Sequence, residues 1–160
     1  MAIDGRVFFD TSVLLAGLIE MGDASVASRQ ILDAVATGDV KRPMTAWHCC
    51  LEFYSVATRL PAGWRLEPEQ ARLLLTSEIM DLIHVCDLPE AARRPFLASA
   101  GAERVAGGRV YDAHIAEIAR LAGARLVVTD NRRHFVGLMR HGIRVLTAVE
   151  FTDEHGSENA

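Results

Sequence analysis

Lysine is nearly absent from this sequence: Lys41 is the only one among 160 residues, although lysine and arginine together number 17. A phosphatase or receiver-like α/β domain would use an aspartate, here Asp10, as nucleophile or phosphate acceptor. Such a domain would need a lysine beside that aspartate. The scarcity of lysine therefore argues against this class of protein.

Cysteine and long hydrophobic runs are also scarce. The three cysteines, Cys49, Cys50 and Cys86, form no disulfide framework and match no zinc-binding spacing, so we expect buried thiols in a reducing compartment. The apolar run at residues 13–19 is broken by Gly17 and is too short to span a bilayer, and no signal peptide precedes it. We therefore expect a cytoplasmic protein that does not associate with membranes.

Several catalytic motifs are missing as well. The glycines between Gly101 and Gly108 punctuate a loop and form no G-x-G-x-x-G fingerprint, and no Ser-His-Asp or cysteine nucleophile arrangement is visible. A formal net charge of −4 argues against a protein that grips nucleic acid by overall charge alone, although it leaves room for a local basic rim.

The sequence does contain enough apolar material for one core, at 50% hydrophobic and 24% charged residues. No linker, internal repeat or low-complexity segment divides it. We predict a single domain over residues 1–151 and a polar, disordered tail over residues 152–160.

Short apolar runs alternate with amphipathic stretches along the chain. This pattern predicts a three-layer α/β/α sandwich with a mainly parallel central sheet. The expected strands cover residues 6–9, 41–44 (weakened by Pro43), 82–88, 125–128 and 143–146. The expected helices begin near residues 13, 24, 45, 68, 89, 109 and 134.

Two acidic residues lie on faces of helices that should be buried. Asp112 shares its face with Ile115 and Ala119, and Glu52 lies beside Phe53 in an apolar helix. A charge on a buried face costs several kcal/mol, by order of magnitude, unless something pairs with it. A glutamate on a solvated face is the alternative for Glu52.

Two further acidic residues follow predicted strands: Asp10 after the first and Asp130 after the strand at 125–128. Ligands of open α/β sheets collect at the carboxyl ends of strands, so we expect Asp10, Glu52, Asp112 and Asp130 to converge there. A plain N-cap of the first helix is the alternative role for Asp10.

Clustered carboxylates repel one another, and a divalent cation relieves that repulsion. Mg²⁺ prefers oxygen ligands and commonly serves phosphoryl chemistry, which points to a metal-dependent reaction of that kind. The hydroxyls of Thr11, Ser12 and Thr129 border the acidic residues and are candidates to orient water or substrate. Capping of helices and turns explains these hydroxyls equally well.

Basic residues lie close to the same acidic residues. Arg109, Arg132 and Arg133 are candidates to bind the phosphates of a nucleic-acid backbone, and His134 is a weaker candidate for substrate contact. A solvated helix face explains these arginines nearly as well.

In four segments the sequence resembles the PIN-domain family, and within it the VapC-type toxins of bacterial toxin–antitoxin pairs. The segments are residues 7–15, 51–53, 108–116 and 126–135, and the similarity extends to about Phe151. The resemblance implies a Mg²⁺- or Mn²⁺-dependent endoribonuclease, usually a homodimer, that is inhibited by a cognate antitoxin bound over the active site. Matched by motif, Asp10, Glu52 and Asp112 correspond to the family's metal-binding acids.

The fourth acid departs from the family pattern. The family commonly has an acid two residues after Thr129, where this chain has Asn131, whereas the carboxylate of Asp130 comes one residue earlier. Either residue can complete the site, because adjacent side chains at a strand end point to opposite sides. The main hypothesis is therefore a metal-dependent ribonuclease toxin. The alternative, suggested by Asn131, is a non-catalytic PIN scaffold that binds RNA or a protein.

Overall fold

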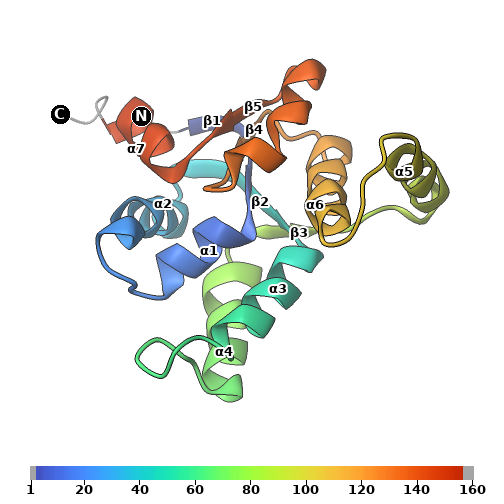
Figure 1. Ribbon diagram of the computed structural model, residues 1–160. Helices are drawn as coiled ribbons and strands as arrows, with labels where there is room; N and C mark the ends of the chain where they lie inside the picture. Colours follow the sequence, from blue (N-terminus) through green and yellow to red (C-terminus); the bar gives the residue numbers. More distant parts are fainter. Residues whose placement is uncertain (1–2, 157–160) are drawn as a thin grey trace.

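The computed structural model describes residues 3–156, and the chain folds around a sheet of five parallel strands in the order β3-β2-β1-β4-β5 (Figure 1). Runs such as Val7–Phe9 and Leu126–Val128 are buried throughout, as expected for strands covered on both faces. The strands are β1 (Ile3–Phe9), β2 (Val40–Ala46), β3 (His84–Cys86), β4 (Leu126–Val128) and β5 (Arg144–Leu146).

Helices cover both faces of the sheet, which confirms the predicted three-layer sandwich. Two of them, α2 and α7, pack together on one face, whereas α6 and α5 lie on the other (Figure 1). The helices are α1 (Thr11–Leu18), α2 (Val26–Ala36), α3 (Trp47–Ala57), α4 (Pro68–Leu74), α5 (Glu90–Ala102), α6 (Arg109–Leu121) and α7 (Ala148–Gly156). Shorter helical turns are η1 (Asp23–Ser25), η2 (Leu75–Met80, π-helical), η3 (Arg132–His134) and η4 (Val136–His141).

The strand order places a switch point between β1 and β4. From β1 the chain moves outward through β2 to β3, then crosses to β4 on the other side of β1. The connections after β1 and β4 therefore leave toward opposite faces of the sheet. A crevice opens at such a point at the carboxyl ends of the strands. Asp10 and Thr129 directly follow these two strands.

The second strand is longer and more central than the sequence suggested. We expected a brief strand over residues 41–44, but β2 runs from Val40 to Ala46 and lies between β1 and β3. Pro43 pairs with Val7 of β1, and β3 joins β2 only from Met44 onward. Pro43 is therefore tolerated because the β3 side of β2 is still unpaired there.

The C-terminal segment is helical where we expected a disordered tail. Residues 152–156 belong to α7, so the predicted tail from residue 152 is wrong over that stretch, and residues 157–160 lie outside the described part. The backbone N–H of Thr147 donates to Glu150 Oε2 at 2.8 Å, and the N–H of Glu150 donates to Thr147 Oγ1 at 3.2 Å. This reciprocal cap begins α7. The ring of Phe151 then packs edge-on against Phe9, 6.3 Å between centroids.

The three cysteines are free and buried, as predicted. Burial raises the pKa of the Cys49 thiol to about 12, so this thiol is inert as a nucleophile. Within residues 3–156, no helix combines the length and the apolar character needed to cross a membrane.

Gly17 allows α1 and α2 to approach closely. A Cβ at this position would lie 2.5 Å from Leu32 Cδ1 and 3.0 Å from the carbonyl oxygen of Ser28. The side chain of Leu32 can move aside, whereas the Ser28 carbonyl belongs to the α2 backbone. The contact therefore requires glycine for reasons of space rather than backbone conformation.

We expect Gly17→Ala to lower the free energy of unfolding by about 1–3 kcal/mol, the usual cost of overpacking. The cost should be smaller in a Leu32→Ala background, which removes the nearest atoms. Gly101→Ala in α5 is the control, because a Cβ there meets nothing within 4 Å. Urea denaturation measures all variants, and equal effects of the Gly17 and Gly101 substitutions would contradict this account.

Candidate active site

The Asp10 carboxylate is the centre of the site. It is buried, with 3% of the residue exposed, at the end of β1. Its Oδ2 accepts hydrogen bonds from Thr129 Oγ1 at 2.8 Å and from Ser12 Oγ at 3.0 Å. Asp10 does occupy the N-cap position of α1, but its side chain makes no capping hydrogen bond of the usual kind, so capping alone does not account for the carboxylate. Asp10 instead joins the carboxyl ends of β1 and β4.

Burial raises the pKa of Asp10 above its ordinary value of 3.8. The hydrogen bonds from Thr129, the Thr11 backbone and Ser12 act in the opposite direction, and the nearby Glu52 carboxylate raises the pKa further. Desolvation is the largest of these effects. A cation beside Asp10 would favour the charged form.

The hydroxyls of Ser12 and Thr11 both lie beside Asp10. Ser12 Oγ also accepts a hydrogen bond from the backbone N–H of Asp130 at 3.0 Å, so it connects α1 to the loop after β4. The Thr11 hydroxyl is buried and makes no hydrogen bond of ordinary geometry within the described chain. The hydroxyl lies close enough to Glu52 to help lower the pKa of that carboxylate, and it remains available to a water molecule or another ligand.

Glu52 lies on α3 with a half-exposed side chain. The His48 imidazole, 3.7 Å away between Nε2 and Oε2, holds the pKa of Glu52 below its ordinary value against the effect of burial. His48 Nδ1 is in turn 2.9 Å from His114 Nδ1 on α6. Burial and the neighbouring His48 lower the pKa of His114. The two histidines thus connect the helix that carries Glu52 with the helix that carries Asp112.

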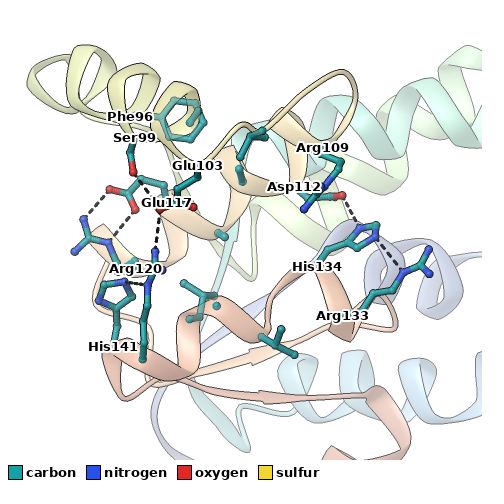
Figure 2. Close-up of a pocket in the computed structure, with 18 of the residues that line it drawn as sticks. Phe96, Ser99, Glu103, Arg109, Asp112, Glu117, Arg120, Arg133, His134 and His141 are labelled. Carbon is teal, nitrogen blue, oxygen red and sulfur yellow. Dashed lines mark hydrogen bonds and ion pairs between the residues drawn. The ribbon is translucent and has the colours of Figure 1, made fainter.

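Asp112 lies in the first turn of α6 and pairs with His134 of η3 (Figure 2). His134 Nδ1 donates to Asp112 Oδ2 at 2.6 Å, and Arg133 Nε donates to His134 Nε2 at 3.1 Å. His134 is therefore the group that pairs with the Asp112 carboxylate on its face of α6. The two contacts also fix the orientation of the ring, with Nδ1 toward Asp112 and Nε2 toward Arg133.

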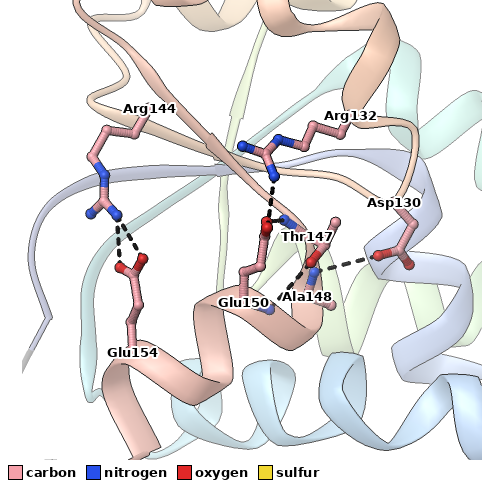
Figure 3. Close-up of polar contacts among 7 residues, drawn as sticks. All are labelled: Asp130, Arg132, Arg144, Thr147, Ala148, Glu150 and Glu154. Carbon is pink, nitrogen blue, oxygen red and sulfur yellow. Dashed lines mark hydrogen bonds and ion pairs between the residues drawn. The ribbon is translucent and has the colours of Figure 1, made fainter.

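The fourth acid, Asp130, is directed toward the start of α7 (Figure 3). Its Oδ1 accepts a long hydrogen bond, 3.4 Å, from the backbone N–H of Ala148. Arg132, a candidate for substrate contact, forms an ion pair with Glu150 of α7 at 2.6 Å. The exposed Asn131 donates its backbone N–H to Thr129 Oγ1 at 3.0 Å. Which of Asp130 and Asn131 faces a metal stays a prediction.

Arg109 differs from Arg132 in having no partner. Among the described residues, its guanidinium makes no hydrogen bond and no ion pair within 4.0 Å. It lies one turn before Asp112 on the same helix and is exposed. Of the arginines near the acidic residues, Arg109 is thus the most available to bind a phosphate.

The four acidic residues do not form one tight cluster. Within residues 3–156, no three His, Cys, Asp or Glu side chains gather in a way that could hold a metal ion. Asp10 interacts with Glu52, whereas Asp112 and Asp130 have the separate partners described above. Mg²⁺ commonly takes one or two carboxylates and keeps several waters, so the carboxylates and the unpartnered Thr11 hydroxyl are donors of the kind that fits it.

Sequence reasoning missed the histidine partners. His48 and Glu52 are four residues apart on α3, a spacing that brings side chains together and was a usable signal. The contact between His48 and His114 joins residues 66 positions apart, so no local pattern predicts it.

The family follows from comparison with known proteins. The model of the PIN domain matches residues 6–133. The chain belongs to the PIN-domain family. It is also 30% identical over 123 residues to Ribonuclease VapC40 from two strains of Mycobacterium tuberculosis, CDC 1551 / Oshkosh and ATCC 25618 / H37Rv, covering 77% of this chain and 85% of each relative. This relationship confirms the resemblance to VapC-type PIN proteins and supports a nuclease.

Two solved structures share the fold of this PIN domain. A chain of FitAB bound to the IR36 DNA fragment aligns with a TM-score of 0.58 at 16% identity, covering 89% of this chain and 95% of that one. A chain of FitAcB from Neisseria gonorrhoeae aligns with a TM-score of 0.56 at 17% identity, covering 89% and 98%. At this level of identity the likeness shows the fold alone.

The raised pKa of Asp10 predicts how the free energy of unfolding depends on pH. Its contribution to the free energy of unfolding is fully present below pH 3.8 and is lost as the pH rises through the raised folded-state value. In EDTA at pH 8, where the buried carboxylate is charged, we therefore expect Asp10→Asn to be more stable than the wild type. The difference should shrink toward pH 4.

Urea denaturation at several pH values measures this difference. Asp33→Asn, at an exposed position of α2, is the control and should change stability little at any pH. A difference between Asp10→Asn and the wild type that stays constant from pH 4 to pH 8 would show that ionisation of Asp10 is not its cause.

Proposed function

We propose that this PIN-domain protein is a metal-dependent endoribonuclease, the toxin of a type II toxin–antitoxin pair. The observation that carries the proposal is the buried Asp10 carboxylate, held by Thr129 at the switch point of the sheet in a relative of Ribonuclease VapC40. A buried acid at this place is costly for stability alone, which favours a functional reason for it.

In this proposal Asp10, Glu52 and Asp112 hold Mg²⁺ or Mn²⁺, directly or through water, and Asp130 or Asn131 completes the site. The ion's chemistry would be to lower the pKa of a water molecule and to stabilise negative charge on the RNA phosphodiester.

The chain's own residues position the groups around that ion. Thr129 and Ser12 orient the Asp10 carboxylate by donating to its Oδ2, and His134 orients Asp112. The Thr11 hydroxyl is available to hold a water molecule, and Arg109 is available to hold a substrate phosphate.

The partners belong to the same proposal. A cognate antitoxin would cover the active site, and co-expression with the protein encoded by the neighbouring reading frame tests for it. We also propose a homodimer in the cytoplasm. Tyr111 and Leu97 are exposed by 57% and 65%, and they line an apolar hollow of about 510 Å³. Such exposed apolar surface favours an interface, and light scattering of the purified protein tests it.

Replacing Asp112 with asparagine should abolish RNA cleavage. Asparagine still accepts the hydrogen bond from His134, so the fold should persist, but the charge that would hold the ion is lost. We expect the cleavage rate to fall by more than about a hundredfold. His134→Ala, which removes only the partner of Asp112, should cost about ten- to a hundredfold.

Cleavage of single-stranded RNA oligonucleotides by purified protein measures these effects, together with growth inhibition on expression. Asp33→Asn is again the matched carboxylate-to-amide control. Native cleavage by a folded Asp112→Asn variant would refute the ribonuclease proposal.

The alternative function is a non-catalytic PIN scaffold, and the separate partners of the acidic residues are the observation that favours it. Titration with Mn²⁺ by calorimetry distinguishes the two. A ribonuclease should bind the ion, with affinity weakened at least about tenfold by Asp10→Asn. No binding at millimolar Mn²⁺ would favour the scaffold.

A further inference from the structure

A cleft of about 640 Å³ extends away from Asp112 between α5, α6 and η4 (Figure 2). One end lies at Asp112 and His134, and the other lies at Glu103 and Arg120. Small or apolar residues line the stretch between these ends: Ala113 and Ala116 on α6, and Val136, Gly137 and Leu138 on η4. The cleft therefore begins at the proposed catalytic site and has an apolar middle.

The charges of the cleft differ between its two ends. At the far end, the arginines are neutralised: Arg120 pairs with Glu117 at 2.7 Å, and Arg140 pairs with Glu103 at 3.3 Å. Each of these guanidinium groups already has a carboxylate, so the far end offers little net attraction to a phosphate.

At the end beside Asp112, the arginines are not neutralised. Among the described residues, Arg109 has no partner, and Arg133 donates only its Nε, to His134. Within residues 3–156, neither arginine forms an ion pair with a carboxylate. The two guanidinium groups outnumber the one carboxylate at this end, Asp112, and guanidinium groups bind anions with planar, charge-assisted hydrogen bonds.

The size of the cleft limits what it can hold. Pockets of about 300–1,000 Å³ enclose one small molecule, so a cleft of this size suits a single nucleotide. Proteins that read single-stranded RNA commonly place one unstacked base against apolar side chains while cations hold the backbone. This cleft has the same arrangement, because its middle is apolar and its end beside Asp112 carries the arginines.

We propose that the cleft between α5 and α6 binds one nucleotide of single-stranded RNA adjacent to the scissile bond, with its phosphate between Arg109 and Arg133. This inference rests on the proposed ribonuclease function and adds a specificity subsite to it. The ribose and base would lie along Ala113, Ala116 and Val136.

The cationic end is tested by Arg109→Ala. We expect KM for a single-stranded oligonucleotide to rise about tenfold with kcat within about twofold of the wild type, because a contact that holds the substrate equally before and during reaction is lost. The slope of log affinity against log salt concentration should become shallower by about 0.7 for one lost phosphate contact. Arg94→Ala, on α5 outside the cleft, is the matched control.

The apolar middle is tested by filling it. A Cβ at Gly137 meets nothing within 4 Å, so Gly137→Phe adds bulk at the cleft wall without a backbone clash. Gly101→Phe, equally unobstructed but outside the cleft lining, is its control. We expect only the Gly137 variant to raise KM, and thermal denaturation verifies that both variants are folded.

Binding without cleavage provides a test that does not depend on catalysis. Adenosine and uridine 3′,5′-bisphosphates, each equivalent to one RNA nucleotide with both phosphates, are titrated into the wild-type protein in EDTA. Amide resonances of residues 113–117 and 136–138 should shift by NMR, and Arg109→Ala and Gly137→Phe should weaken the response. No shift in these resonances at millimolar nucleotide would overturn the proposal.

The outcomes separate this inference from the function on which it rests. If Asp112→Asn abolishes cleavage but Arg109→Ala and Gly137→Phe retain the native KM, the ribonuclease function stands and the nucleotide subsite is wrong. If nucleotides bind in the cleft but the wild type and Asp112→Asn behave alike toward RNA, the ribonuclease function is wrong instead. If a partner peptide shifts these resonances and the nucleotides do not, the cleft is a protein-binding site and the inference fails.

Discussion

The hydrogen bond from Thr129 to Asp10 joins the ends of β1 and β4, the two parallel strands between which the strand order reverses. The α/β/α architecture alone would be served by any small polar residue at this point. Burying a carboxylate there costs desolvation free energy. The hydrogen bonds from two hydroxyls offset this cost only in part, since the pKa of Asp10 remains raised. The protein thus retains a destabilising group at the point where its fold opens a crevice, which is the usual sign of a functional site.

The other acidic residues each have a separate partner. Glu52 and Asp112 each have a neighbouring imidazole, from His48 and His134 respectively. Because His48 also contacts His114, the helices α3 and α6 are joined directly at the mouth of the site. The separation between the carboxylates is therefore set by these helix-to-helix contacts as well as by the sheet.

The sequence predicted the sheet, the layers and the identity of Asp10 as a strand-end acid, because buried parallel strands and the residues that follow them have local signatures. It also identified Asp112 as a carboxylate in need of a partner. It did not predict that His134 is that partner at 2.6 Å, because this contact depends on how η3 packs against α6. The start of α7 was different: the Thr147–Glu150 capping pair was a readable local signal that we overlooked.

The C-terminal helix, α7, also provides a structural reason for the carboxylate at position 130, one residue before the family's usual acid. The loop after β4 is fixed on one side by Ser12, which accepts the N–H of Asp130, and on the other by α7, through Ala148 and the ion pair between Arg132 and Glu150 (Figure 3). A carboxylate at 130 is well placed near the N-terminus of α7, where the helix dipole favours negative charge. Asp130 thus has a structural reason to be acidic that does not require a metal. The side chain of Asn131, one residue further on, carries no comparable structural role among the described contacts.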